Sequence, residues 1–168
     1  PDRCHHCRVC NMCVLRQDHH CPWIRNCIGF GNHKYFFLLV VYSVLSCTFI
    51  NFTLPSTVLR SMDQDLLPAH RFLLVLCLTL SLAMGALLLV FLAFHTWLML
   101  QGMTTIEFCE KTTIGDMQRK GGRYDAGLRR NICAVLGPQP LLWFLPCSPP
   151  VGDGVHFPTE GRDAEASD

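Results

Sequence analysis

Two long runs without an acidic or basic residue dominate the chain. The first covers residues 35–54 and the second residues 72–100, where only His95 could carry a charge. At ~1.5 Å per residue, twenty helical residues reach across the ~30 Å hydrocarbon core of a bilayer. The alternative is a pair of buried core helices, but a chain of 168 residues has little other sequence with which to cover them. The pattern therefore predicts two transmembrane helices.

The polar segments around these runs predict an orientation. Residues 1–34 and 101–158 are richer in Lys and Arg than the connector 55–71, which has two basic and two acidic residues. Cytoplasmic loops carry an excess of basic residues, so we expect both segments to face the cytosol and the connector to face the lumen or the exterior. Residues 159–168 are polar and predict a disordered tail.

Length and charge limit the function further. A chain of 168 residues with a formal net charge of +1 suits one domain and gives no support for a nucleic-acid partner. The chain opens inside a cysteine-rich stretch and has no initiator Met. We therefore expect it to be a fragment of a longer protein.

Six of the eleven cysteines fall within 24 residues near the start, interspersed with histidines. Such short spacings are typical of a metal site in a reducing compartment rather than of disulfides. Tetrahedral zinc often takes two ligands from a C-x2-C turn, and Cys7 with Cys10 or Cys10 with Cys13 could form it. Spacing leaves that choice open, and it leaves open whether Cys21 is a ligand. The predicted fold class is an α-helical polytopic membrane protein with a small cytosolic zinc-binding, cysteine-rich domain.

The stretch "DHHCPW", which begins at Asp18, makes the pattern specific. The chain from His6 to Phe36 fits HC-x2-C-x2-C-x4-DHHC-x5-C-x4-N-x3-F at every interval. "TTIE" follows the second apolar run at Thr104, and "NICAVLG" begins at Asn131. These motifs resemble the DHHC family of protein S-acyltransferases, also called palmitoyltransferases. The resemblance implies four transmembrane spans, of which two are present here.

The resemblance implies two zinc sites, each with three Cys and one His. One would consist of Cys7, Cys10, His20 and Cys27. The other would use His6 and Cys13 with two cysteines from an upstream C-x2-C that this chain lacks. Cys4 and His5 lie nearby and could substitute for those cysteines, but we expect that second site to be incomplete here.

The resemblance assigns Asp18, His19 and Cys21 to catalysis. A free thiol with a pKa of ~8.5 is mostly protonated at neutral pH, so an adjacent imidazole must take its proton and a carboxylate must orient that imidazole. The implied reaction is ping-pong: Cys21 takes a long-chain acyl group from palmitoyl-CoA or a similar acyl-CoA, and passes it to a cysteine of a membrane-associated substrate protein. Without the resemblance, Cys21 could equally be one more zinc ligand.

Other residues are expected near the acyl-CoA. The resemblance places Trp23 at the mouth of an acyl cavity. Arg16, Arg25 and Lys34 are candidate contacts for the CoA phosphates, although ordinary juxtamembrane positive charge explains them equally well.

The downstream motifs predict supporting roles. Thr104 and Glu107 fit a Thr-x-x-Glu capping arrangement for a cytosolic helix, and a hydroxyl of Thr104 or Thr105 could hydrogen-bond Asp18. Asn131 would brace the C-terminal segment. His95, near a span end, is more often interfacial or bonded to a neighbouring helix than part of a site.

A rival hypothesis is a non-catalytic zinc-binding membrane adaptor. An unligated Cys21 beside His19 separates the two, because an adaptor would not need it. We expect the protein in the membrane of the Golgi, the endoplasmic reticulum or the plasma membrane.

Overall fold

The computed structural model of the chain describes residues 1–114 and 123–157. The tail predicted at 159–168 lies outside them. The chain divides into two compact units, one formed by residues 1–38 with the described residues from His95 onward, the other by Leu39–Phe94.

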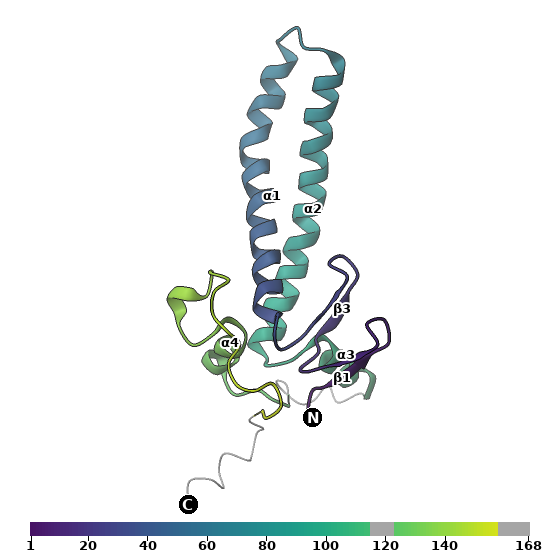
Figure 1. The fold of residues 1–168 in the computed structure, drawn as a ribbon. Coiled ribbons are helices and arrows are strands. Elements are labelled where there is room, and N and C mark those ends of the chain that lie inside the picture. The colour runs from purple at the N-terminus through teal and green to yellow at the C-terminus, as the bar shows by residue number, and fades with distance from the viewer. Residues whose placement is uncertain (115–122, 158–168) are drawn as a thin grey trace, which may run out of the picture. The chain divides into compact units, whose positions relative to one another are not determined.

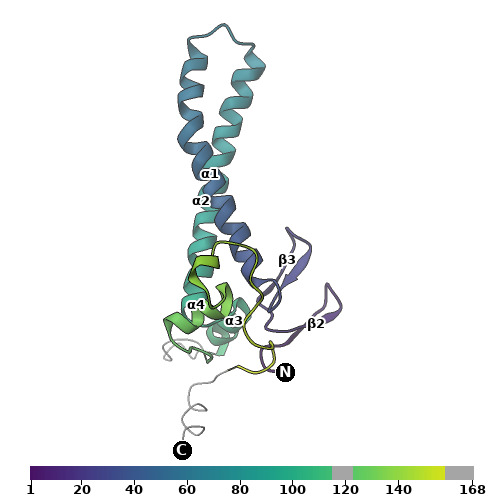
Figure 2. The same ribbon diagram turned by 60° about the vertical axis from the view of Figure 1, so that its left-hand side comes forward.

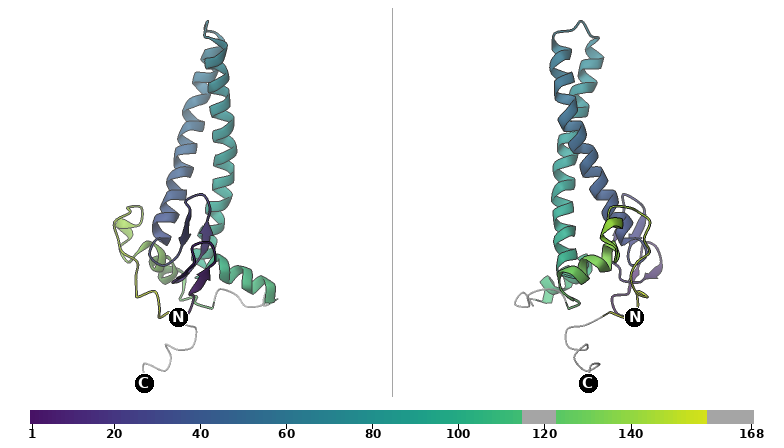
Figure 3. Two further views of the ribbon diagram at one scale, coloured as in Figure 1. Left: turned by 45° about the vertical axis from the view of Figure 1, so that its right-hand side comes forward. Right: turned by 90° about the vertical axis from the view of Figure 1, so that its left-hand side faces the viewer.

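Two short antiparallel hairpins form the first part of the unit that contains the N-terminus (Figure 3). Strand β1 (His5–Cys7) pairs with β2 (Met12–Val14), and β3 (His19–Cys21) pairs with β4 (Asn26–Ile28). Each turn has four residues and ends in a residue with positive φ: Asn11 at 52° and Arg25 at 50°. The left-handed residue lets each chain reverse before the second strand begins. Strands of three residues are too short to show in a hydrophobic pattern, and the sequence did not predict them.

Asn32, one of the motif residues, joins the second hairpin to the first residues of helix α1 (His33–Met62). Its side-chain Nδ2 donates to the Cys27 carbonyl at 2.9 Å, and its Oδ1 accepts the Gly29 N–H at 2.9 Å. Among its described residues this unit also contains three short helices: α3 (Thr105–Ile114), α4 (Leu128–Leu136) and the 3-10 helix η1 (Pro140–Leu142).

The second unit is a helical hairpin of the Leu39–Met62 part of α1 and the first 27 residues of α2 (Pro68–Leu100) (Figures 1 and 2). Helix α1 continues through Pro55 to Met62, beyond the predicted span. The two helices meet at small and polar side chains. Ser81 Oγ donates to the Cys47 carbonyl at 3.4 Å, and Asn51 Nδ2 donates to the Ser81 carbonyl at 3.5 Å. Such contacts are typical of helix pairs in membranes.

The apolar side chains of this hairpin mostly point outward. In the most apolar window of each helix, only 17% of the residues of α1 and 6% of those of α2 are buried. Phe52 is 88% exposed and Val90 70%. Core helices of a soluble domain would bury these side chains, so their exposure favours membrane-spanning helices over that alternative.

Gly85 gives a test of the helix contact. A Cβ at this position would lie 3.2 Å from Cys47 Cβ, tighter than an ordinary contact. We expect Gly85→Leu to push the helices apart and to lower the free energy of unfolding in detergent by about 1–3 kcal/mol. Ala86→Leu, at the neighbouring exposed position, should leave thermal unfolding unchanged. Equal effects of both substitutions would contradict this packing.

Candidate functional site

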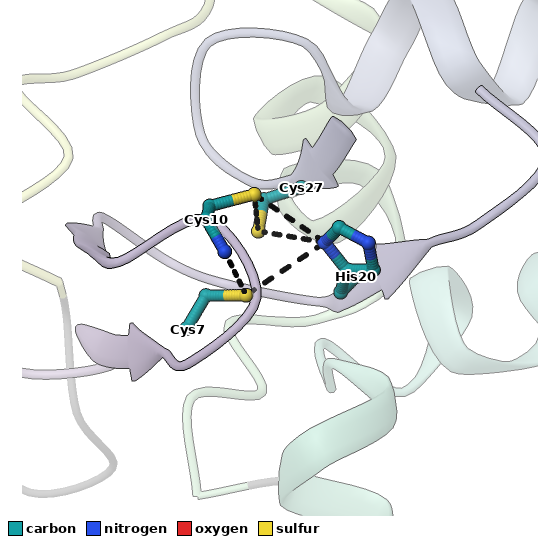
Figure 4. A group of neighbouring side chains, drawn as sticks. All are labelled: Cys7, Cys10, His20 and Cys27. Carbon is teal, nitrogen blue, oxygen red and sulfur yellow. Dashed lines mark hydrogen bonds between the residues drawn. The ribbon is translucent and has the colours of Figure 1, made fainter. Parts of the chain in front are cut away.

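Four side chains from the two hairpins converge on one point. Figure 4 shows the ring of His20 among the sulfurs of Cys7, Cys10 and Cys27. The His20 Nδ1 lies 3.7 Å from Cys7 Sγ, 3.4 Å from Cys10 Sγ and 3.6 Å from Cys27 Sγ. Cys7 is the last residue of β1 and Cys10 lies in the turn that follows, while His20 and Cys27 face each other across β3 and β4. Of the two possible C-x2-C turns, the structure uses the first.

These distances fit a single tetrahedral ion. With metal–sulfur bonds of about 2.3 Å and metal–nitrogen bonds of about 2.0 Å, ligand atoms lie about 3.5–3.8 Å apart. The measured distances, including 3.5 Å between the Cys10 and Cys27 sulfurs, match that spacing to within a few tenths of an ångström. Burial and the neighbouring thiols raise the pKa of Cys27 when no cation is present. A divalent cation would offset this by stabilising the thiolates, so the cluster could bind a metal ion.

The second predicted metal site is present only in part. Cys13 Sγ lies 3.6 Å from His6 Nδ1, and the two residues face each other across β1 and β2. Within residues 1–114 and 123–157, no third Cys, His, Asp or Glu side chain joins them in a metal-sized group. Cys4 and His5 therefore do not complete this pair in the structure.

The two hairpins have similar sequences, and their comparison shows how Cys21 differs from its counterpart Cys7. His6, Cys7 and Cys13 recur fourteen residues later as His20, Cys21 and Cys27, at the same register positions. His5 likewise recurs as His19, but Ile24 stands where the first hairpin has Cys10. Cys21 is thus the structural counterpart of a metal ligand without the second cysteine of a C-x2-C turn.

His19 and His20 point to different partners although they are adjacent. Successive side chains of a strand alternate between its two faces. His20 meets the cysteine cluster, whereas His19 Nδ1 lies 2.7 Å from Asp18 Oδ2. Cys21 is two residues beyond His19 in β3, so its side chain lies on the same side of the strand. The described structure contains no hydrogen bond between His19 and Cys21, and Cys21 is only 5% exposed.

The Asp18 carboxylate is fully buried and has three donors. Its Oδ2 accepts hydrogen bonds from His19 Nδ1 and the Thr105 hydroxyl, and its Oδ1 accepts the Thr105 N–H, the last two at 2.9 Å. The hydrogen bond from a threonine hydroxyl to Asp18, which the sequence predicted, is therefore present. Burial would raise the pKa of Asp18, but the His19 and Thr105 hydrogen bonds outweigh it and hold the pKa well below its usual range.

The predicted capping arrangement is present at the start of α3. Glu107 Oε2 accepts the Thr104 N–H at 2.9 Å, and Thr104 Oγ1 accepts the Glu107 N–H at 3.3 Å. Arg3 adds a partner that no sequence motif indicated. Its guanidinium makes a bidentate pair with Glu107 at 2.6 and 2.9 Å. This pair ties the cysteine-rich segment to the helix that holds Asp18.

His95 also lies beside Asp18, which its sequence context did not indicate. It is 5% exposed, with its Nδ1 3.9 Å from Asp18 Oδ2. Its ring centroid lies 5.6 Å from that of His19. Phe36, a motif residue, contacts both rings edge-on, at 5.0 Å from His19 and 5.4 Å from His95. No local pattern links His95 to Asp18, because they lie far apart in the chain.

Arg16 borders a cavity of about 290 Å³ that Arg3 and Arg130 also line. Its Nη1 donates to the Ala134 carbonyl at 2.9 Å, while its Nε is buried without a hydrogen-bond partner among the described residues. Burial, with the neighbouring charge of Arg3, lowers the pKa of Arg16 to about 10. Arg16 nevertheless stays positively charged at neutral pH.

The other residues expected near acyl-CoA lie in two places. Trp23, which is 91% exposed, and Arg25 belong to the turn between β3 and β4. Lys34 is buried, and its Nζ donates to the Leu142 carbonyl at 2.7 Å and to the Ser148 hydroxyl. These bonds give Lys34 a structural role in holding the C-terminal segment.

Asn131 makes the bracing contacts expected of it. Its Nδ2 donates to the Leu100 carbonyl at 2.9 Å and to Asp125 Oδ1 at 2.7 Å, and its Oδ1 accepts the Ala126 N–H at 3.1 Å. The side chain is 4% exposed. Asn131 thus fixes α4 to the end of α2.

Comparison with known proteins places this site in a family. The family model described as DHHC palmitoyltransferase matches residues 1–112. The chain belongs to the DHHC palmitoyltransferase family. It is 41% identical over 159 residues to palmitoyltransferase ZDHHC15A of Danio rerio, with 94% of this chain and 48% of the relative covered. It is also 38% identical over 161 residues to palmitoyltransferase ZDHHC15 of Homo sapiens (94% and 47% covered). Against palmitoyltransferase ZDHHC2 of Danio rerio it is 36% identical over 160 residues (95% and 44%).

Membership of the DHHC family confirms the resemblance seen in the motifs and the fold class predicted from them. The described residues contain two apolar helices and a Cys and His cluster, as expected for a membrane protein of this family with a metal-binding domain. The chain spans about half the length of the curated relatives it matches.

The adjacent histidines of β3 give a direct test of the metal cluster. We expect His20→Ala to lower the metal content by about one ion per chain, because three cysteines alone leave the tetrahedron open. His19→Ala should keep its metal, because His19 bonds Asp18 on the other side of the strand. Metal analysis of the purified variants measures both. Equal metal loss in the two variants would contradict the assignment.

Substitution of Thr105 tests how much its hydroxyl stabilises the buried Asp18 carboxylate. Because the folded pKa of Asp18 is lowered, its contribution to stability is complete above the ordinary carboxyl pKa of about 4 and declines as the pH falls below it. Thr105→Val removes one bond to a charged group and should lower the free energy of unfolding at pH 7 by about 1–3 kcal/mol.

The same substitution should also raise the pKa of Asp18, so acid unfolding should begin at a higher pH. Thr105→Ser keeps the hydroxyl and is the matched control. If Val and Ser variants unfolded alike at every pH, the hydroxyl bond would contribute nothing.

Proposed function

We propose that the protein to which this chain belongs is a protein S-acyltransferase that moves a long-chain acyl group, palmitoyl or similar, from acyl-CoA to cysteines of other proteins. The main support is that the two faces of β3 have different partners. His20 joins the cysteine cluster, while His19 pairs with Asp18 on the side of Cys21. A metal-binding adaptor would not need a buried cysteine and a carboxylate-bound histidine on the face away from the metal. The names of the curated relatives support the same activity.

The Asp18–His19 pair determines where a proton can be held. Asp18 is an ionised acceptor, so the His19 Nδ1 facing it at 2.7 Å carries the hydrogen. The neutral ring then has its lone pair on Nε2, which can accept the thiol proton of Cys21. The Asp18 carboxylate stabilises the imidazolium that results.

Two transfers complete the proposed reaction. In the first, the Cys21 sulfur bonds to the acyl carbonyl carbon, the bond from that carbon to the CoA sulfur breaks, and the proton held by His19 passes to the CoA thiolate. In the second, a substrate thiol gives its proton to His19 and attacks the Cys21 thioester. The acyl group moves to the substrate sulfur and Cys21 recovers the proton.

Zinc is the ion that best suits the cluster of Cys7, Cys10, His20 and Cys27, since three thiolates and one imidazole are typical of closed structural zinc sites. The bound ion would supply a fixed tetrahedral link between the two hairpins and so hold β3 in place. The pair of His6 and Cys13 would contribute half of a second site.

The acyl-CoA head group has candidate partners in the same unit. Arg16 supports a phosphate contact, because its buried Nε lacks a partner within the described residues and it borders a cavity shared with Arg3 and Arg130. Trp23 and Arg25, on the exposed turn next to Cys21, would meet the acyl chain and the lipid surface. Lys34 has structural partners instead.

We further propose that the cysteine-rich segment and the C-terminal segment both face the cytosol. The Arg3–Glu107 pair and the unit shared by the two segments support a common side. The eleven cysteines are all free, as a reducing compartment allows. Membrane-bound substrate proteins with cytosolic cysteines, at the Golgi, endoplasmic reticulum or plasma membrane, fit this arrangement. A nucleic-acid partner does not.

Cys21→Ser tests the activity. Full-length protein incubated with a labelled palmitoyl-CoA should form an adduct that hydroxylamine removes, as it removes thioesters. Cys21→Ser should abolish that adduct and keep the metal content unchanged, because Cys21 lies outside the metal cluster.

Cys147→Ser, which changes an exposed cysteine, is the control and should still form the adduct. Loss of metal in Cys21→Ser would make Cys21 a ligand. Wild-type protein that forms no adduct would refute the activity itself.

A further inference from the structure

His95 and His19 both lie near the same carboxylate oxygen, Asp18 Oδ2. Asp18 Oδ2 accepts from His19 Nδ1 at 2.7 Å and from the Thr105 hydroxyl at 2.9 Å, and His95 Nδ1 stands 3.9 Å from the same atom. The 3.9 Å separation is within ion-pair range but longer than a hydrogen bond. Because the ionised carboxylate is only an acceptor, an N–H on the nearest nitrogen of His95 would be attracted to it.

The ring of His95 also limits where His19 can turn. His95 and Phe36 each contact the His19 ring, at centroid distances of 5.6 and 5.0 Å, and they contact each other at 5.4 Å. The three rings pack against one another beside Asp18. A rotation of His19 away from Asp18 would have to displace one of these neighbours.

Packing alone does not explain a histidine at this position. His95 is 5% exposed, and burying an imidazole costs free energy that an apolar ring of similar size would avoid. The orientation of Nδ1 toward Asp18 uses the polar edge of the ring. A phenylalanine would fill the same space and leave the carboxylate without this neighbour.

We propose that His95 is a positioning residue for acyl transfer, which acts through Asp18. Its Nδ1 edge attracts the Asp18 carboxylate, and its ring face confines His19, so the pair keeps one orientation while Cys21 reacts. Helix α2 thereby contributes to the chemistry of a strand far away in the sequence. The proposal rests on the acyltransferase activity proposed above.

Two substitutions of His95 distinguish the contribution of its Nδ1 from that of its ring. His95→Asn places an amide group near the position of Nδ1, whereas His95→Phe keeps the ring and removes both nitrogens. The measurement is the rate of acyl-enzyme formation in full-length protein at saturating palmitoyl-CoA, with KM and metal content recorded for each variant. His70→Phe, an exposed histidine of the same helix, is the matched control.

We expect His95→Phe to slow acyl-enzyme formation about tenfold or more, with KM and metal content unchanged, and His95→Asn to stay within about threefold of wild type. In an Asp18→Asn background, His95→Phe should cause little further loss, because the two residues act together.

Three results would overturn the proposal. They are wild-type rates in His95→Phe, an equal loss in Asn and Phe variants, and metal loss in His95→Phe, which would make its role structural. Wild-type protein that forms no acyl-enzyme would refute the proposed activity rather than the role of His95.

Discussion

The strand β3 has three residues, and the alternation of its side chains constrains everything around it. His20 is held by the sulfurs of the cluster, so the residues on either side of it, His19 and Cys21, must face the other way. A metal ion bound to His20 would therefore fix the orientation of two residues that it does not touch. In this way the motif would place a metal ligand and the proposed nucleophile at neighbouring positions without competition between them.

The buried carboxylate of Asp18 organises the opposite side. It receives hydrogen bonds from His19 in the adjoining strand and from Thr105 at the start of α3, and it lies near His95 at the end of α2. A buried charge is stable only when several donors surround it. That requirement draws three separate parts of the chain to one point, and the Arg3–Glu107 pair keeps α3 in place.

The sequence predicted the apolar helices, the metal-binding character of the first segment, the capping box at Thr104 and the threonine bond to Asp18. Motif spacing could not choose between the two C-x2-C turns, because both have the same interval. Strands of three residues leave no periodic signal in the sequence. The alternation of side chains that separates His19 from His20 could therefore not be predicted. His95 and Arg3 were missed for another reason: their partners are distant in sequence, and only the folded chain brings them together. The sequence could not tell whether Lys34 contacts the CoA phosphates or a group within the protein, because a positive charge alone does not reveal the buried partners Leu142 and Ser148.

In the proposed enzyme, one short strand, β3, binds metal on one side and carries an acyl group on the other at the same time. Mass spectrometry of full-length protein after reaction with palmitoyl-CoA, under native conditions and then after digestion, tests it directly. We expect molecules that carry the acyl group and the full complement of metal together, with the acyl group mapped to Cys21. Acylated molecules that have always lost a metal ion, or an acyl group that maps to Cys7, Cys10 or Cys27, would contradict it.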